Sequence, residues 1–431
     1  MVGGSFVSAH DWLSTTDKPR SNLVRLFADH SIDDSFHPDP NNLVNAIALQ
    51  ADGRMLVAGA FTTIGGVGRA GLARLAADGS VDPGFDSGAQ GIYALAVQAD
   101  GSILVGGCFT TIGSPAASHA IPYLARLHAD GSVDTGYVPN VDHCVHSIAL
   151  SSDGSAVIGG EFGTVGNMAR VRIARVLASG ALDTSFDPGS GASGSVQAIV
   201  VQPDGKILVG GEFDRFAGNA AGGLVRLAPS GTVDAGFAAF RPGSLVALAL
   251  QADGKVLAAG GFYMTATLPY TGLIRMNADG CGDAGFPATD EFIQSLAAQA
   301  DGRVAMAGQF TAILGQARTN LAFLSAAQAP AELLDRVGSA VIWHRSGSCP
   351  ELESTPLLEF SVVGNLYAPL GPMHRIAAGW RYDGFAAPVA QNFFLRARGA
   401  TSSGAFGSSA GLVATTRWLF GSDEIFAGRF E

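Results

Sequence analysis

The stretch QPDGKILVGGEF (residues 202–213) has the pattern of a complete β-hairpin. Apolar runs lie on both sides of Asp204-Gly205, and Asp-Gly is a strong turn signal because both central positions of a type I′ turn need positive φ. The closing signature of two small residues, a variable residue and phenylalanine occurs seven times. The signatures end at Phe6, Phe61, Phe109, Phe162, Phe213, Phe262 and Phe310, at spacings of 48 to 55 residues. The chain is therefore a repeat protein.

Each full unit contains a second hairpin, such as LARLAADGSVDPGF (residues 72–85). Two hairpins supply four strands, which with their connections fill roughly fifty residues, the size of one propeller blade. A single blade cannot bury both of its faces, so repeated blades pack in a ring. We predict an all-β fold with a seven-bladed β-propeller of four-stranded antiparallel blades. A six-bladed ring is the alternative, because the first and last units are incomplete.

The hairpins have constant lengths, whereas the connections vary. The link between the two hairpins runs 17 residues from Phe6 to Leu23 and 15 from Phe109 to Leu124, but 11 elsewhere. In a four-stranded meander these links and those between units emerge on one face, and the Asp-Gly turns on the other. Variable loops on a rigid scaffold commonly carry binding sites. We therefore expect binding on the variable-loop face.

The glycine two residues before each signature phenylalanine suits a strand that another backbone approaches closely. In the second hairpins, an arginine and an aspartate eight residues later recur in six units. These pairs begin at Arg25, Arg74, Arg126, Arg175, Arg226 and Arg275. A residue needed once for chemistry would not recur six times, so we interpret the pairs as architectural, acting through turn hydrogen bonds and ion pairs between blades.

The pattern QPDGKILVGGEF followed by GLVRLAPSGTVDAGF (residues 223–237) resembles the delta-60 repeat family of bacterial β-propellers. The resemblance covers residues 1–325 and implies a propeller fold, with no catalytic residues to carry over. Since the chain begins inside a blade, we expect upstream sequence, where a signal peptide could lie. We expect a secreted or cell-surface protein of a bacterium.

Residues 337–431 lack the repeat and show shorter alternations such as SAVIWHRS and NFFLRARGA. A tryptophan strand followed by FFLRARGATSSG resembles a fibronectin type III or immunoglobulin-like β-sandwich. The missing Cys-Trp-Cys frame disfavours a true immunoglobulin domain. We predict a propeller over residues 1–325, a linker over 326–336 and a β-sandwich over 337–431.

The charge balance argues against nucleic-acid binding, since 26 Lys and Arg face 37 Asp and Glu, with no basic stripe. No apolar run reaches the roughly 18 residues of a membrane span, so no membrane insertion is predicted.

The cysteines Cys108, Cys144, Cys281 and Cys349 show no CxxC spacing, and we predict free or buried thiols. The alternative is a Cys108–Cys144 bridge between neighbouring repeats, which would argue for export.

Residues 142–146, DHCVH, form the densest polar group. Their side chains His143, Cys144 and His146 are candidate metal ligands, with local polar capping as the alternative. His146 also begins an innermost strand, in a slot that other units fill differently. The slot residues Asn45, Tyr93, His146, Gln197 and Gln294 are predicted to bind a ligand at the channel mouth, and Val246 occupies the same slot. A solvated strand start is the alternative interpretation.

Glu161 and Glu212 share another slot in adjacent units, and paired carboxylates can hydrolyse glycosides. No nucleophile elbow, P-loop or HExxH motif is present. We therefore predict a non-enzymatic binding or scaffold protein that recognises a protein or glycan through the variable-loop face. The alternatives are a carbohydrate-active enzyme with its site at the channel mouth and a purely structural component of a surface assembly. No cofactor is predicted, and the oligomeric state stays open.

Overall fold

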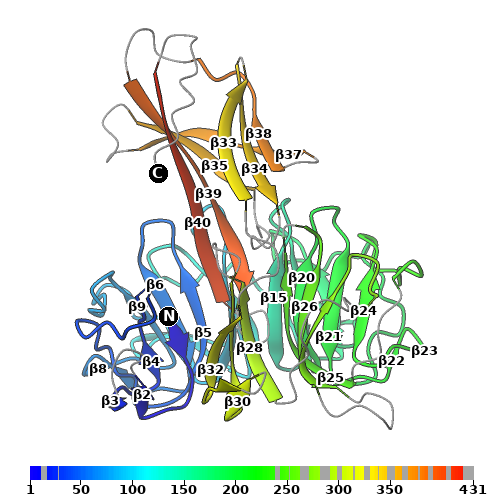
Figure 1. Cartoon of the computed structure of the whole chain (residues 1–431). Helices are drawn as coiled ribbons and strands as arrows, with labels where there is room; N and C mark the ends of the chain where they lie inside the picture. Colours follow the sequence, from blue (N-terminus) through cyan, green and yellow to red (C-terminus); the bar gives the residue numbers. More distant parts are fainter. Residues whose placement is uncertain are drawn as a thin grey trace.

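The computed structural model is all-β in the part of the chain that it describes, and its strands pair antiparallel with one exception noted below (Figure 1). The described residues contain no apolar helix long enough to cross a bilayer. They comprise residues 1–10, 17–27, 29–237, 243–251, 253–262, 271–281, 292–298, 303–313, 316–324, 331–337, 339–346, 355–361, 367–376, 379–386, 392–403 and 409–420.

Six antiparallel triplets of strands repeat one plan, in which an inner strand pairs with a middle strand and the middle strand with an outer strand. The triplets are β5 (Val44–Leu49), β6 (Met55–Gly59) and β9 (Leu72–Leu75); β10 (Ile92–Val97), β11 (Ile103–Gly107) and β14 (Leu124–Leu127); β15 (Val145–Leu150), β16 (Ala156–Gly160) and β19 (Ile173–Val176); β20 (Val196–Val201), β21 (Ile207–Gly211) and β24 (Leu224–Leu227); β25 (Gly243–Leu250), β26 (Val256–Phe262) and β27 (Thr271–Met276); β28 (Phe292–Ala298), β29 (Val304–Gln309) and β32 (Leu321–Leu324). These triplets are the blades of a β-propeller, as predicted.

The first unit supplies only β1 (Val2–Gly3), paired with β4 (Leu23–Val24), and β1 lies beside β5. This unit also meets the last one. The His30 ring stacks on Phe323 with 4.1 Å between ring centroids, and Arg303 Nη1 lies 2.7 Å from His30 Nε2. The two ends of the repeat series are thereby brought into contact, which closes the ring.

The predicted fourth strand of a blade is replaced by a single β-bridge, which joins two residues. In five units the outer strand bridges the segment after its turn, at Leu26 and Ile32, Leu75 and Val81, Leu127 and Val133, Val176 and Leu182, and Leu227 and Val233. The links between predicted hairpins hold small two-stranded hairpins that the sequence analysis treated as loops. They are β2 (Ser8–His10) with β3 (Asp17–Pro19), β7 (Thr63–Ile64) with β8 (Val67–Gly68), β12 (Ile112–Ser114) with β13 (Ala117–His119), β17 (Thr164–Val165) with β18 (Met168–Ala169), β22 (Arg215–Phe216) with β23 (Asn219–Ala220), and β30 (Ala312–Ile313) with β31 (Gln316–Ala317).

The Asp-Gly turns lie where the sequence predicts them, but the predicted type I′ geometry is wrong. Gly53 has φ +86° and Gly205 has φ +80°, whereas the preceding aspartates do not have positive φ. The Gly53 N–H donates to Gln50 O at 2.9 Å, and the Gln50 N–H donates to Arg54 O at 2.8 Å. This is a type I turn followed by a glycine in the left-handed region, a common three-residue hairpin loop.

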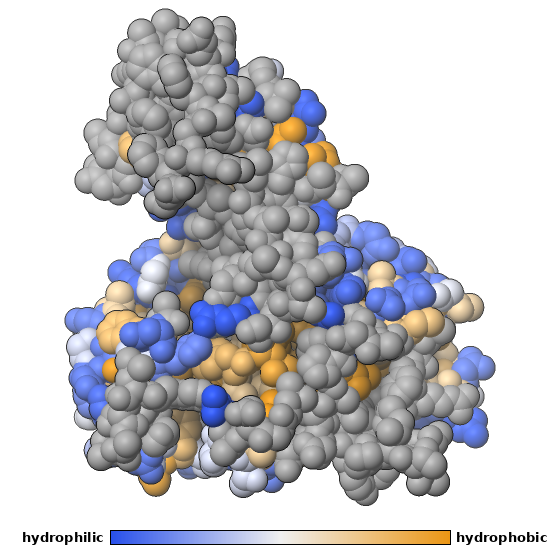
Figure 2. All heavy atoms as spheres, in the orientation of Figure 1, coloured by the Kyte–Doolittle hydropathy of each residue, from blue (hydrophilic) through white to orange (hydrophobic). Residues whose placement is uncertain are grey.

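The hydrophobic core lies between blades. One cluster combines Leu56 of β6 with Ile92 and Val105 of the next triplet, and all three side chains are fully buried. The middle strands β6, β11, β16 and β21 are buried along their whole length because a neighbouring blade covers each face. In Figure 2 the rim of the propeller near the C-terminal strands is largely hydrophilic, and apolar residues are visible further inside.

The recurring arginine links each blade to the next. Arg126 Nε donates to Asp134 Oδ2 at 2.8 Å within its own unit, and Arg126 Nη1 donates to the carbonyl oxygen of Ala178 in the following unit at 2.6 Å. Its guanidinium carbon lies 4.5 Å from the centroid of the Tyr137 ring. The architectural role is thus confirmed, although the ion pair lies within one unit and a hydrogen bond to a carbonyl joins the blades.

The C-terminal strands form two sheets around one apolar cluster that includes Trp343, Trp380 and Phe393. The sheets are β33 (Ala331–Val337), β34 (Ala340–Ser346), β38 (Gly379–Tyr382) and β37 (His374–Ile376), and β36 (Ala368–Pro372), β35 (Leu357–Ser361), β39 (Asn392–Ser403) and β40 (Ser409–Phe420). Strand β33 begins inside the segment predicted as a linker. The assignment to a fibronectin type III or immunoglobulin-like sandwich stays a prediction.

The hairpin of β39 and β40 extends from this C-terminal part into the propeller (Figure 1). Strand β40 lies against the inner strands β5 and β10, and β39 lies against β25 and β28. The exception to antiparallel pairing is here, where Ala410 of β40 pairs in parallel with Ala48 of β5. Arg398 Nη1 also donates to Ala51 O at 2.7 Å, beside an Asp-Gly turn. The C-terminal part is therefore attached on the face of the Asp-Gly turns.

Candidate functional site

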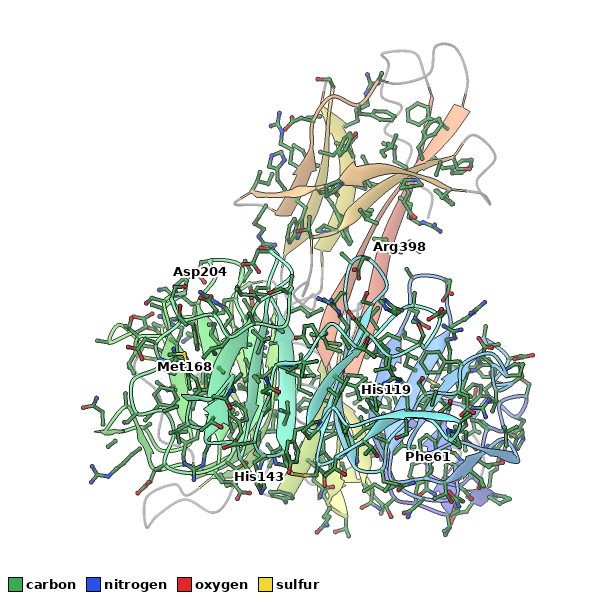
Figure 3. The ribbon with its side chains drawn as sticks, turned by 180° about the vertical axis from the view of Figure 1, so that it is seen from behind. Phe61, His119, His143, Met168, Asp204 and Arg398 are labelled. Carbon is green, nitrogen blue, oxygen red and sulfur yellow. A yellow bond between two sulfur atoms is a disulfide. The ribbon has the colours of Figure 1, made fainter. Side chains whose placement is uncertain are left out.

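The face opposite the C-terminal strands, which we call the loop face, carries the candidate site. Figure 3 shows His143 at the end of the propeller far from those strands, and Asp204, in an Asp-Gly turn, near them. His143 belongs to the link between two units, so this link lies on the loop face. This arrangement matches the one expected for a meander.

Every inner strand carries a β-bulge at the slot predicted to bind a ligand. The pairing register shifts between Val145 and Ser147 of β15, which leaves His146 as the extra residue. The equivalent shifts in the other units lie at Asn45, Tyr93, Gln197, Val246 and Gln294. A bulge redirects a side chain from the normal alternation of a strand. We call these six residues the bulge ring.

The glycine opposite each bulge is required by close backbone approach. A Cβ on Gly160 would lie 2.0 Å from Cys144 O, and one on Gly211 would lie 2.1 Å from Ser195 O. No side chain fits at such a distance. The same holds at Gly59, Gly107, Gly260 and Gly308, as the sequence analysis expected from the repeated glycine. The backbone of the site is thus the same in six units, while the residue that it presents differs.

The structure brings some members of the bulge ring together. The Tyr93 and His146 rings stack with 5.2 Å between centroids. Asn45 Nδ2 donates to Ile92 O at 2.8 Å, and Gln197 Nε2 donates to Ser195 Oγ at 3.0 Å. Gln294 is exposed. Two neighbouring pairs are therefore linked, Tyr93 with His146 through their rings and Asn45 with the backbone carbonyl just before Tyr93.

His143 and His146 both contact Glu161. The distance from His143 Nδ1 to Glu161 Oε2 is 3.4 Å, and the distance from His146 Nε2 to Glu161 Oε1 is 3.3 Å. His143 lies before β15, and the bulge redirects His146, so both imidazoles reach one carboxylate. Burial lowers the pKa of His146, and the negative charges of Glu161 and Glu212 act in the opposite direction. The repeat pattern indicated Glu161 only as one of two carboxylates in a shared slot, and nothing in the sequence indicated its place beside the histidines.

A disulfide joins Cys108 to Cys144, with 4.5 Å between their Cα atoms. The prediction of free thiols was wrong for these two residues and the alternative of a bridge between neighbouring repeats is confirmed, because the end of β11 and the loop before β15 meet on the loop face. Cys281 is a free, exposed thiol, and Cys349 lies outside the described residues. The donor atoms of His143, Cys144 and Glu161 lie within 4.8 Å of one another.

Asp142 has a structural role, in contrast to the candidate metal ligands that follow it in the chain. Its Oδ1 accepts from the backbone N–H groups of Gly163 at 2.8 Å and Thr164 at 3.0 Å. Burial acts to raise the pKa of Asp142, but hydrogen bonds from Thr164 and Gly163 lower it below its usual value. The alternative of local polar capping is thus correct for this member of DHCVH.

A groove of about 390 Å³ lies beside the disulfide, between two neighbouring units. Its lining is rich in hydroxyl groups and includes Gln90, Cys108, Thr110, Thr111, Ser114 and Ser118. Most of these residues belong to the longer link after Phe109, which the sequence analysis identified as variable. Tyr123 of the same link stacks on His143 with 6.0 Å between ring centroids. The link, the disulfide and the histidines therefore form one continuous surface.

Two solved structures are similar to this chain at low sequence identity. A crystal structure of a protein of unknown function from Bacteroides caccae is 14% identical, with a TM-score of 0.35, over 65% of this chain and 92% of that one. A streptogramin B lyase structure is 12% identical, with a TM-score of 0.36, over 71% of this chain and 91% of that one. No curated protein matches the chain.

The family model described as a domain of unknown function (DUF5122) beta-propeller matches residues 50–85, 98–137, 151–186, 202–237 and 251–286. Each matched segment begins at or near an Asp-Gly turn and ends at the aromatic residue of a second hairpin. These five repeats therefore have the pattern of the DUF5122 beta-propeller family, the delta-60 repeat type.

Proposed function

We propose that this protein is a non-enzymatic binding protein, exported or surface-associated, that holds a glycan on the loop face of its propeller. The observation that carries the proposal is the bulge ring. The same β-bulge recurs in six units, but the residue at the bulge differs: it is asparagine, tyrosine, histidine, glutamine, valine and glutamine in turn. The arginine that joins the blades recurs unchanged, as expected of an architectural residue.

The chemistry of the loop face suits saccharide hydroxyl groups. Asparagine, glutamine, serine and threonine side chains both donate and accept hydrogen bonds, as sugar hydroxyls do. The groove beside Cys108 adds Thr110, Thr111, Ser114 and Ser118 to the amides of the ring. Tyr93 and Tyr123 supply aromatic faces next to these polar groups. The Cys108–Cys144 disulfide supports the exported location, since disulfides persist in oxidising compartments.

A glycan array followed by calorimetry with the best ligand tests the proposal. We expect Tyr93→Ala and Gln197→Ala each to weaken binding by about 1–2 kcal/mol, the size of a lost hydrogen bond or ring contact. Arg54→Ala is the matched control, because Arg54 is exposed near an Asp-Gly turn on the other face. Unchanged affinity in both loop-face variants would reject the proposed site.

The same experiment separates the alternatives. Release of product from a bound glycan, abolished by Glu161→Gln, would favour the carbohydrate-active enzyme. Binding to a protein partner without any glycan ligand would favour protein recognition on this face. Self-association that increases with concentration, without any ligand, would favour the structural component.

A further inference from the structure

Three donor atoms of different chemistry converge beside the disulfide. They are a ring nitrogen of His143, the Sγ of Cys144 and a carboxylate oxygen of Glu161, all within 4.8 Å of one another. His146 Nε2 lies 3.3 Å from the other carboxylate oxygen of Glu161. Imidazole, thiolate and carboxylate are the three protein ligand types of zinc.

The disulfide prevents Cys144 from acting as a metal ligand. A thiolate, not a disulfide sulfur, is the form of cysteine that binds a metal. While Cys144 is bonded to Cys108, only His143 and Glu161 of the three can act as ligands. The oxidised protein therefore lacks the strongest soft donor of the group.

We propose that reduction of the Cys108–Cys144 disulfide creates a site for a zinc-type divalent cation, held by His143, Cys144 and Glu161. A dithiol reductant supplies two electrons and two protons, the S–S bond breaks, and two thiols form while the dithiol becomes a disulfide. The Cys144 thiol then loses its proton to solvent as the metal–sulfur bond forms. His146 orients Glu161 from the other side. This inference stands apart from glycan binding, since it concerns the metal alone.

The backbone that places these ligands does not depend on the disulfide. The Glu161 N–H donates to Cys144 O at 2.9 Å, so the two ligand positions are joined directly. Asp142 fixes the start of the loop through Gly163 and Thr164. Breaking the S–S bond therefore leaves Cys144 beside Glu161.

The site is open to solvent from the loop face. The side chains of His143 and Glu161 are 53% and 45% exposed, whereas Cys144 is 6% exposed. A cation can thus approach from outside and reach a sulfur at the base of the site. Three protein ligands leave the fourth tetrahedral position of zinc to water or to a ligand.

Two single variants test the proposal, because both remove the disulfide but only one keeps Cys144. In a chain carrying Cys281→Ser and Cys349→Ser, we compare Cys108→Ser with Cys144→Ser by zinc calorimetry. Cys108→Ser should bind one Zn²⁺ per chain without any reductant. Changes to residues that merely orient ligands alter metal affinity by about 10–100-fold, so the loss of a ligand in Cys144→Ser should weaken binding at least about tenfold.

Cobalt provides a spectroscopic readout of the same site. Cys108→Ser loaded with Co²⁺ should show a thiolate-to-cobalt charge-transfer band that is missing in Cys144→Ser and reduced in intensity by His143→Gln. The chain that starts with its disulfide intact should show the band only after a dithiol has reduced the disulfide and the dithiol has then been removed under argon. Equal zinc affinity in Cys108→Ser and Cys144→Ser would overturn the proposal, as would a cobalt band in the oxidised chain.

Discussion

Arg175 of one blade donates from Nη1 to the carbonyl oxygen of Pro229 in the next blade at 2.7 Å. Its Nε is bound to Asp183 of its own unit at 2.6 Å, and its guanidinium carbon lies 5.1 Å from the centroid of the Phe186 ring. One side chain thus joins a turn, an aromatic residue and the neighbouring blade. Because this arrangement recurs around the ring, the arginine is part of what holds adjacent blades in position.

Replacing Arg175 by glutamine should destabilise the protein by about 2 kcal/mol, because the change leaves the mostly buried Asp183 and a carbonyl oxygen without their charged partner. Urea unfolding followed by circular dichroism, which reports the strands of the whole chain, would measure the free energy of unfolding. Arg54→Gln is the control, with an expected change of at most about 1 kcal/mol, because Arg54 is exposed and its contacts with Asp52 and Asp82 are longer, at 3.5 and 3.2 Å. Equal effects of the two changes would contradict the proposed role.

Gly211→Ala should destabilise the protein by about 3 kcal/mol or more, since the added Cβ would lie 2.1 Å from Ser195 O and would push the bulge apart. Gly68→Ala, also in a strand, is the matched control, because nothing lies within 4 Å of its added Cβ. In thermal unfolding, the melting temperature of Gly211→Ala should be clearly lower than that of Gly68→Ala. If Gly211→Ala lowers the melting temperature only slightly, the close approach of Ser195 O does not require glycine at this position.

Reduction of the Cys108–Cys144 disulfide should lower the free energy of unfolding by about 4 kcal/mol. The two cysteines are 36 residues apart, and a bridge that closes a loop of this length restricts the unfolded chain by roughly that amount. Urea unfolding with and without a reductant measures the difference. The double variant Cys108→Ser with Cys144→Ser should match the reduced protein and should no longer respond to the reductant.

Asp183 should contribute to stability in mildly acidic and neutral solution but not in strong acid. Burial alone would raise its pKa, but hydrogen bonds from Ser185 and Arg175 lower the pKa below its usual value. A carboxylate with a depressed folded-state pKa stabilises the protein above the unfolded value of about 3.9, and the contribution is lost as the pH falls through the folded pKa.

The measurement is the free energy of unfolding between neutral pH and strong acid. Asp183→Asn should be less stable than the unchanged protein at neutral pH, and the difference should shrink as the pH falls below about 4. Asp52→Asn, in an exposed Asp-Gly turn, serves as the control. A difference for Asp183→Asn that is independent of pH would show that its charge is not responsible.

The fold was largely predictable because its signals are local. Asp204-Gly205 marks a turn, the apolar runs beside it mark two strands, and the fixed period marks a ring of similar units. The turn geometry was predicted wrongly, since Asp-Gly at the turn does not specify how many residues the loop contains. The small hairpins such as β7 with β8 were missed because strands of two or three residues leave no period in the sequence.

The candidate site was predictable only in part. The slot of Asn45, Tyr93 and His146 was visible from alignment of the repeats, but the bulge that redirects these side chains was not. A bulge is a mismatch in register between two strands, so one strand alone does not reveal it. Likewise, no pattern in the sequence indicated that Glu161 lies between two histidines.

The sequence by itself determined the hairpins, their repetition and the glycines, because turn geometry and strand alternation depend on residues a few positions apart. Tertiary structure alone decided that Cys108 meets Cys144, that His143 and His146 share one carboxylate, and that β39 and β40 enter the propeller. These contacts join residues of different blades, strands or sheets. The disulfide and the insertion of β39 and β40 depend on how blades and sheets pack, and the shared carboxylate depends on the bulge in the β15–β16 hairpin, which no local pattern in the chain encodes.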